Sequence, residues 1–363
     1  MSCVMISAGG TGGHVFPALA VADELRRRGH TVVWLGSHNG PEARWVRDAG
    51  VEFHGLSVSA LRGKGPLRLL FAPLQLLRAV AGAMAILWRQ QPDVVLGLGG
   101  FVAGPAGLAS RLLRRPLVIH EQNACAGLTN RALARIGAER VLSGFPGAFA
   151  PGVNAEVVGN PVRRAIAELP PPAERFAGRE GPLRILVLGG SQGALALNQW
   201  IPRALARLAD DNPVIRHQAG ERALTIARDA YAESGLDDVA VEPFIDDMAA
   251  AYGWADLVIC RAGALTVSEV AAAGVGALLI PFPAAVDDHQ TRNAAYLSEH
   301  GAGRLWPQHE LEEEALAEYI AGWMTDARKG RRGLLAMAEA ARRRAPEAAD
   351  VRVAEHCLEV ARG

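Results

Sequence analysis

Short apolar runs of strand length alternate with longer segments of helical periodicity along most of this chain. Val4–Ile6 and Thr31–Leu35 read as strands, and Pro17–Arg28 between them reads as a helix that begins near Pro17. The alternation continues to about residue 160 and resumes at Arg184. Because parallel strands are joined by helical crossovers, this rhythm predicts an α/β protein with parallel sheets.

Two glycine-rich turns follow apolar strands at corresponding places in the two halves of the chain. The first is Gly9-Gly-Thr-Gly-Gly-His14, and the second is Gly189-Gly-Ser-Gln-Gly-Ala194. Turns without Cβ atoms let a phosphate or a sugar approach the backbone amides at a helix start. We therefore expect two similar domains facing each other across a cleft. The first would span 1–161, joined by a C-terminal helix at about 343–363, and the second would span 162–342.

Composition narrows the class of protein. The 38 Lys and Arg residues balance the 38 Asp and Glu residues, which argues against bulk nucleic-acid binding. The four cysteines lie far apart without metal-binding spacing, so we expect reduced thiols in a cytosolic compartment. The chain runs from Met1 directly into a strand, so no signal peptide is expected. A stretch rich in Pro, Arg and Glu at 161–182 reads as the linker between the domains.

Residues 53–92 are the strongest local anomaly, because they contain no Asp or Glu among many leucines and several basic residues. Arg78 and Pro73 interrupt the apolar run, which argues against a transmembrane helix. One interpretation is a buried crossover helix preceded by a basic loop. The other adds a surface that rests on anionic lipid. The basic residues of that surface would be Arg62, Lys64 and Arg68.

The segment Arg261–Glu269 follows an apolar strand and opens a helix that is expected to run from Thr266. Backbone amides around Ala264, Leu265 and Thr266 would point at a negatively charged ligand. Glu269 has two interpretations. It is spaced from Thr266 as the acidic residue of a capping box, and it could instead accept hydrogen bonds from two ribose hydroxyls. One carboxylate cannot serve both roles.

Three further positions are candidates for donor binding. Gln290 stands in a polar cluster at a helix start, where its amide suits sugar hydroxyls, although a capped surface helix explains the neighbouring aspartates equally well. The backbone around Ile245 could pair with the edge of a base. Arg163 is either an ordinary surface charge or a phosphate ligand.

Two residues compete for the role of general base. His14 ends the first glycine turn, where a group that titrates near neutral pH could take a proton from an attacking hydroxyl. A purely structural hydrogen bond is the alternative for His14. Glu121 is the rival base, in the polar segment His120-Glu-Gln-Asn123 that follows an apolar strand. Asn123 could orient the acceptor.

Six motifs, in order, resemble those of the MurG family of UDP-N-acetylglucosamine:N-acetylmuramyl-(pentapeptide) pyrophosphoryl-undecaprenol N-acetylglucosamine transferases. They are Gly9–His14, Gly97–Gly107, His120–Asn130, Gly159–Arg163, Gly189–Ala194 and Gly263–Glu269. The resemblance covers nearly the whole chain. It departs from the family pattern at Phe101, Gly276 and His289.

The resemblance implies a GT-B fold of two Rossmann-like parallel-sheet domains, with the donor UDP-GlcNAc in the C-terminal domain and lipid I in the N-terminal one. It implies an inverting hexosyltransferase that moves GlcNAc to the 4-hydroxyl of MurNAc in lipid I, giving lipid II and UDP. This step of peptidoglycan synthesis, on which cell shape and division depend, takes place at the cytoplasmic face of the bacterial inner membrane, with the enzyme bound peripherally.

By position, the resemblance also assigns the site residues. His14 and Asn123 would lie on the acceptor side, with His14 the candidate general base. No cofactor is implied, the sequence has no Asp-x-Asp metal motif, and a non-essential divalent cation is left open. The donor contacts would come from Thr11, Gly12, Gly13, Arg163, Ser191, Ile245, Ala264, Leu265, Thr266, Glu269 and Gln290.

Three other function classes share some of these features. A nicotinamide-dependent dehydrogenase is disfavoured, because neither Gly10-Thr-Gly12 nor Gly97-Leu-Gly99 is completed by a third glycine. The second strand also lacks the acidic residue that binds a ribose in dehydrogenases. A UDP-sugar epimerase of the same fold would act without an acceptor. A non-catalytic nucleotide-sugar binding subunit would bind the donor without turnover.

Overall fold

The computed structural model describes residues 1–58, 66–190, 193–208, 213–324 and 327–362, with the backbone alone at 66–71, 286 and 327–329. The chain divides into two compact units. Unit 1 comprises Met1–Arg163 and Pro346–Gly363, and unit 2 comprises Arg164–Ala345. The bounds expected from the sequence lie close to these.

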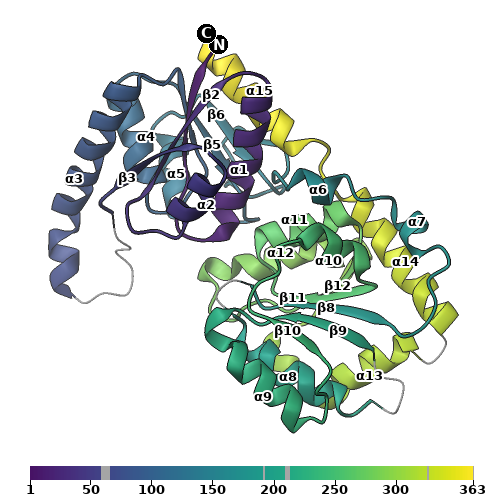
Figure 1. Cartoon of the computed structure of the whole chain (residues 1–363). Coiled ribbons are helices and arrows are strands. Elements are labelled where there is room, and N and C mark those ends of the chain that lie inside the picture. The colour runs from purple at the N-terminus through teal and green to yellow at the C-terminus, as the bar shows by residue number, and fades with distance from the viewer. Residues whose placement is uncertain (59–65, 191–192, 209–212, 325–326, 363) are drawn as a thin grey trace. The chain divides into compact units, whose positions relative to one another are not determined.

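Unit 1 is built on a parallel sheet whose described strands follow the order β3-β2-β1-β4-β5-β6-β7. These strands are β1 Cys3–Ser7, β2 Thr31–Ser37, β3 Glu52–Leu56, β4 Val94–Gly97, β5 Leu117–Glu121, β6 Arg140–Ser143 and β7 Ala155–Val157. The helices are α1 Gly12–Arg27, α2 Glu42–Asp48, α3 Pro66–Gln90, α4 Ala103–Leu112, α5 Leu128–Arg135 and α15 Ala349–Arg362. Figure 1 shows helices on both faces of this sheet.

Successive residues of β1 point into two different cores, because side chains alternate along a strand. Val4 and Ile6 pack with buried residues of α1 and with Cys357 of α15. Met5 packs on the opposite face with buried residues of α3 and α4. Both faces of the sheet are therefore covered, as expected for parallel strands. The C-terminal helix α15 contacts α1 directly and so completes unit 1.

Unit 2 repeats this arrangement, with described strands in the order β10-β9-β8-β11-β12-β13. These strands are β8 Arg184–Leu188, β9 Val214–Gln218, β10 Ala240–Glu242, β11 Leu257–Cys260, β12 Gly276–Leu279 and β13 Gly303–Leu305. The helices are α6 Arg164–Ala167, α7 Pro172–Phe176, α8 Leu195–Leu205, α9 Leu224–Glu233, α10 Met248–Trp254, α11 Ala264–Ala273, α12 His289–Ser298, α13 Glu313–Met324 and α14 Ala327–Arg343, with short 3-10 turns at Glu221–Ala223, Val286–Asp288 and Gln308–Glu310. Apart from the additional edge strand β7 of unit 1, the described strands of the two units follow the same order, which confirms two Rossmann-like domains.

Three expectations about local structure were wrong. α1 begins at Gly12, so that Pro17 lies inside the helix instead of at its start. α11 begins at Ala264, two residues before the expected start. α1 follows its N-cap residue Thr11, so Gly12 and Gly13 are already helical, and α11 directly follows its N-cap residue Gly263. The supposed linker at 161–182 contains α6 and α7, and Arg175 of α7 donates to the carbonyl of Ala273 at 2.6 Å, which anchors this segment to unit 2.

α3 buries only one of its faces. Ala83 and Leu87 are fully buried in the core of unit 1, whereas Leu77 is 66% and Trp88 is 70% exposed. The interpretation as a buried crossover helix is therefore correct for one face alone. None of the helices in the described part of the chain has both the length and the apolar character needed to cross a membrane. Arg62, Lys64 and the side chain of Arg68 lie outside the described residues.

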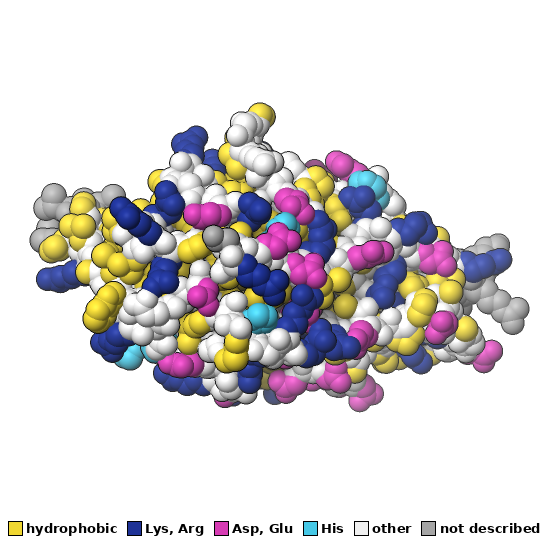
Figure 2. All heavy atoms as spheres, turned by 90° about the horizontal axis from the view of Figure 1, so that it is seen from above, with side chains coloured by type: hydrophobic (Ala, Val, Ile, Leu, Met, Phe, Trp, Pro, Cys, Tyr) yellow, Lys and Arg dark blue, Asp and Glu magenta, His cyan; other side chains and the backbone are white. Residues whose placement is uncertain are grey.

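The distribution of charged side chains and the state of the cysteines are those expected from the composition. Figure 2 shows acidic and basic side chains mixed over the face that it draws, as expected for a chain with no net charge. All four cysteines are free thiols. Burial raises the pKa of the Cys260 and Cys357 thiols to about 12, so these two side chains behave as small apolar groups.

Candidate active site

The functional turns lie where the winding of each sheet reverses. In unit 1 this switch point lies between β1 and β4, and in unit 2 it lies between β8 and β11. Doubly wound sheets bind ligands outside the carboxyl ends of the strands at such points. Gly9 and Gly10 follow β1, and the turn at 98–100 follows β4. In unit 2, Gly189 and Gly190 follow β8, and the turn at 261–263 follows β11.

The two glycine turns of unit 1 pack against each other and against His14. A Cβ atom on Gly100 would lie 2.1 Å from the carbonyl oxygen of Gly9, and one on Gly99 would lie 3.1 Å from the His14 ring. Gly99 and Gly100 also have φ angles of +98° and +79°, which favour glycine. The absence of a side chain at Gly99 is therefore what makes room for the imidazole of His14.

His14 is the third residue of α1 and is half-buried. Its Nδ1 atom lies 2.7 Å from Oε1 of Gln122. Gln122 in turn lies 3.0 Å from Nδ1 of His120 through its Nε2 atom, and Nε2 of His120 lies 2.9 Å from the carbonyl oxygen of Gly159. The sequence places Gln122 in a polar segment but gives no sign of its role, because its partner His14 lies 108 residues away.

Glu121, the rival base, is a fully engaged carboxylate at the end of β5. Only 3% of the residue is exposed. Its Oε1 atom accepts from the backbone N–H and the side-chain amide of Asn123, at 2.9 and 3.2 Å. Its Oε2 atom accepts from the backbone of Gly127 at 3.1 Å and from Asn130 at 2.8 Å. These four bonds match the acceptor capacity of a carboxylate, so the structure does not support Glu121 as a proton acceptor.

Replacing Glu121 by glutamine should therefore destabilise unit 1. The new amide group would turn donors toward groups that are themselves donors, and a buried unsatisfied donor costs about 1–3 kcal/mol. Urea unfolding followed by circular dichroism measures the change, with Glu359→Gln as the control because the Glu359 side chain is 64% exposed. A Glu121→Gln protein as stable as its parent would contradict this structural role.

Three other predicted residues of unit 1 lie around the start of α1. Thr11 is the exposed N-cap residue of α1, and its side chain makes no capping hydrogen bond. The Arg163 guanidinium lies 5.4 Å from the ring centroid of Phe16, which follows His14 by two residues. A Cβ atom on Gly12 would lie 2.8 Å from the same ring. Arg163 is therefore held beside the N-terminal turns of α1 instead of extending freely into solvent.

In unit 2, the start of α11 has the geometry of an anion site. Gly263 is its N-cap, with φ −63° and ψ 144°, and contributes no side chain to cap the helix. Thr266 is the third helical residue, so the predicted capping box with Thr266 as N-cap is wrong. The first-turn amides at Ala264, Leu265 and Thr266 carry the positive end of the helix dipole.

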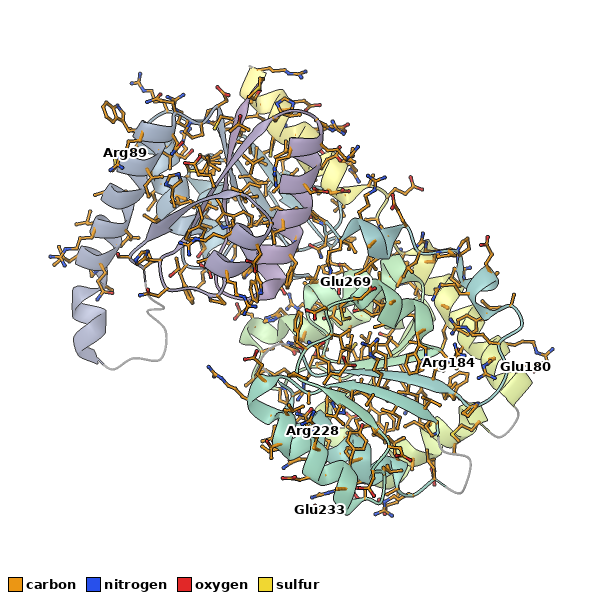
Figure 3. All side chains as sticks on the ribbon, in the orientation of Figure 1. Arg89, Glu180, Arg184, Arg228, Glu233 and Glu269 are labelled. Atoms are coloured by element: carbon orange, nitrogen blue, oxygen red, sulfur yellow. The ribbon has the colours of Figure 1, made fainter. Side chains whose placement is uncertain are left out.

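Glu269 is buried on α11 (Figure 3), with 4% of the residue exposed. The hydroxyl of Tyr252 on α10 donates to its Oε2 atom at 3.2 Å. Tyr252 is itself fully buried, so its hydroxyl holds the carboxylate of Glu269 in a fixed orientation from the protein interior. The sequence offered no signal for Tyr252, because only the packing of α10 on α11 brings the two residues together.

Polar side chains of α12 are tied to the turns that precede α11 and α12. Oε1 of Gln290 accepts from the backbone N–H of Phe282 at 2.8 Å. Asn293 donates to the carbonyl of Ala262 at 3.1 Å, which joins α12 to the turn before α11.

Two further predicted donor residues belong to unit 2. Ile245 is fully buried and precedes α10, whereas Ser191 lies outside the described residues. Among the residues that the structure describes, no three His, Cys, Asp or Glu side chains are grouped to hold a metal ion.

Comparison with known proteins identifies the family to which this chain belongs. The glycosyltransferase family 28 N-terminal domain matches residues 4–142, and the C-terminal domain of the same family matches residues 184–351. Two curated relatives, from Halorhodospira halophila and Marinobacter nauticus, are named UDP-N-acetylglucosamine–N-acetylmuramyl-(pentapeptide) pyrophosphoryl-undecaprenol N-acetylglucosamine transferase. They are 57% and 54% identical to this chain over 361 and 360 residues, covering 99% of this chain and 99% and 98% of their own lengths.

Solved structures agree with the sequence relatives. The crystal structure of MurG from Acinetobacter baumannii has a TM-score of 0.83 and 41% identity, and covers 99% of this chain and 100% of its own. A UDP-GlcNAc 2-epimerase from Neisseria meningitidis has a TM-score of 0.64, 13% identity, and covers 99% and 100%. The second likeness, at that identity, extends to the fold alone. Through its near full-length identity with the curated relatives and its two family 28 domains, this chain belongs to the MurG family of glycosyltransferases.

Proposed function

We propose that this chain transfers GlcNAc from UDP-GlcNAc to the 4-hydroxyl of MurNAc in lipid I, giving lipid II and UDP in peptidoglycan synthesis. The observation that carries the proposal is the near full-length identity of 57% with a transferase of that name. The site supports it, because a histidine stands at the switch point of one domain and an anion-binding helix start at that of the other.

The donor would bind mainly to unit 2. Its diphosphate would lie on the first-turn amides of α11, and the ribose hydroxyls would donate to Glu269, whose carboxylate is already oriented by Tyr252. The amide of Gln290, whose oxygen accepts from Phe282, would present its nitrogen to the sugar hydroxyls. The backbone near Ile245 would meet the base. Ser191, Thr11, Gly12 and Gly13 complete the proposed donor set.

The acceptor would bind to unit 1, beside His14 and Asn123. In the proposed step His14 takes the proton of the acceptor hydroxyl, and the hydroxyl oxygen forms the new bond to the anomeric carbon of GlcNAc. The bond from that carbon to the diphosphate breaks, and UDP leaves with its electron pair. A single displacement inverts the anomeric centre. Arg163 and the α11 helix start would stabilise the leaving charge, so the proposal includes no resident cofactor and no required metal.

Release of UDP from UDP-GlcNAc tests the function directly, measured with purified protein in the presence and absence of a short-chain lipid I analogue. We expect release only with the acceptor. Release, or an epimerised sugar, without the acceptor would favour a UDP-sugar epimerase instead. Tight donor binding without turnover under both conditions would favour a non-catalytic binding subunit.

We also propose that the protein works at the cytoplasmic face of the inner membrane, resting on anionic lipid through α3 and the basic segment before it. The support is the exposed apolar face of α3, where Leu74, Leu77 and Trp88 are 48%, 66% and 70% exposed. Arg89 lies on the same helix (Figure 3). Apolar side chains beside basic ones are the composition of surfaces that insert at a lipid interface.

Changing both Leu77 and Trp88 to glutamate should weaken binding to anionic vesicles. Each substitution removes an apolar side chain worth about 1.5–3 kcal/mol when buried and adds a charge that the membrane repels, so we expect a loss of at least tenfold. Co-sedimentation with vesicles measures it. Ile226→Glu in unit 2, at a residue 40% exposed, is the matched control. Equal binding by both variants would refute docking through α3.

A further inference from the structure

The hydrogen bonds behind His14 have only one consistent direction. The carbonyl oxygen of Gly159 accepts hydrogen bonds and cannot donate, so Nε2 of His120 donates to it. Burial lowers the pKa of His120 to about 4, so at neutral pH its ring carries a single N–H. Nδ1 of His120 is therefore an acceptor, and the side-chain amide of Gln122 donates to it through Nε2 at 3.0 Å.

A second contact requires the same orientation of Gln122. Its Nε2 atom also lies 3.0 Å from the backbone carbonyl oxygen of His120, which can only accept. The nitrogen of the Gln122 amide thus faces two acceptors, and its oxygen faces His14. Because only 1% of Gln122 is exposed, water does not compete for this amide.

The consequence reaches His14. The amide oxygen of Gln122 accepts, so Nδ1 of His14, 2.7 Å away, carries the proton. A neutral imidazole has one N–H, which leaves the lone pair on Nε2. We propose that Gln122 is a positioning residue for the transfer reaction, because its amide oxygen holds His14 as the Nδ1-protonated tautomer and thereby makes Nε2 the atom that takes the acceptor proton.

This inference rests on the proposed function. Free imidazole side chains in water prefer the Nε2-protonated form, so the site holds His14 in the less favoured tautomer. Serine proteases use a buried aspartate to orient their catalytic histidine in the same way, and loss of the correct tautomer there costs about 10⁴-fold in kcat. Here a neutral amide takes that place. A Cβ atom on Gly99 would lie 3.1 Å from Nδ1 and Cε1 of His14, so the ring keeps this orientation toward Gln122 only because position 99 has no side chain.

Nitrogen-15 NMR of protein labelled at histidine tests the tautomer in the parent protein. The His14 signals are assigned by their loss in His14→Gln. We expect a protonated Nδ1 and an unprotonated Nε2 for His14, and a protonated Nε2 for His120. A protonated Nε2 on neutral His14 would overturn the proposal without any further variant.

Two substitutions of Gln122 test the cause. Gln122→Met has similar length but no acceptor, so His14 should revert toward the Nε2-protonated form. Its kcat should fall by at least tenfold, toward the loss of about 10²–10⁴ for removing a general base, with KM for UDP-GlcNAc unchanged. Gln122→Glu keeps an acceptor oxygen toward His14, and its second oxygen, when protonated, can still donate to the two acceptors on His120, so this variant should retain the tautomer and more of the activity.

The outcomes separate this inference from the proposed function. Equal loss of kcat in Gln122→Met and Gln122→Glu, with the His14 tautomer unchanged in both, would reduce Gln122 to a packing residue and overturn the inference. A parent protein that shows the expected tautomer but transfers no sugar to the lipid I analogue would refute the proposed function, and with it the catalytic part of the inference.

Discussion

Replacement of His14 by alanine is expected to lower the rate of sugar transfer by about 10² to 10⁴-fold while leaving UDP-GlcNAc bound with parental affinity. The reason is the division of labour between the domains: His14 belongs to unit 1, and the helix start, Glu269 and Gln290 belong to unit 2. Steady-state UDP release with the lipid I analogue measures kcat, and calorimetric titration with UDP-GlcNAc in the absence of acceptor measures donor binding.

The matched control is His309→Ala. The side chain of His309 is 78% exposed on unit 2, so its loss should leave kcat unchanged. Turnover by His14→Ala at the parental rate would remove His14 as the base. Loss of activity together with loss of the folding transition would instead assign His14 a structural role, so the melting temperature of each variant is recorded alongside its kinetics.

Replacement of Glu269 by glutamine is expected to weaken UDP-GlcNAc binding by about 10 to 100-fold, since hydrogen bonds to a charged group contribute about 1.5–3 kcal/mol. Glutamine preserves the volume of the side chain and still offers an oxygen to Tyr252, 3.2 Å away in the parent. Only one oxygen then remains for the hydroxyls of the ribose. Calorimetric titration with UDP-GlcNAc, in the absence of acceptor, gives the dissociation constant directly.

If Glu269 only capped a helix, its replacement by glutamine would give a different result. Loss of a helix cap costs about 0.5–2 kcal/mol of stability and leaves ligand affinity intact. Glu233→Gln serves as the control, because Glu233 is exposed on α9 of the same unit. Parental affinity in Glu269→Gln, with lowered stability, would mean that Glu269 supports α11 and does not hold the ribose.

Local pattern in the sequence was sufficient for the fold class and for the turns that bear the site. Apolar runs of strand length, separated by helical segments, predict two parallel sheets, because hydrophobic periodicity is a property of neighbouring residues. Glycines at 9–13 and at 97–100 mark the turns, and at Gly9, Gly12 and Gly100 a Cβ atom would lie 2.6, 2.8 and 2.1 Å from neighbouring atoms. His14 could be named a candidate base because it belongs to such a turn.

Tertiary structure alone decided what the polar residues of those turns do. Glu121 looked like a base in the sequence, but donors from Asn123, Gly127 and Asn130 occupy both of its oxygens. α11 begins at Ala264, two residues before the start predicted from the sequence, so Thr266 is not the N-cap residue and Glu269 is not part of a capping box.

The partners that define the site come from distant parts of the chain. Gln122 reaches His14 across 108 residues, and Tyr252 reaches Glu269 across 17. Hydrophobic periodicity determines which face of a strand or helix is buried. The direction of a hydrogen bond, and hence the atom of His14 that can accept a proton, depends on which carbonyl or amide the fold places opposite each polar group.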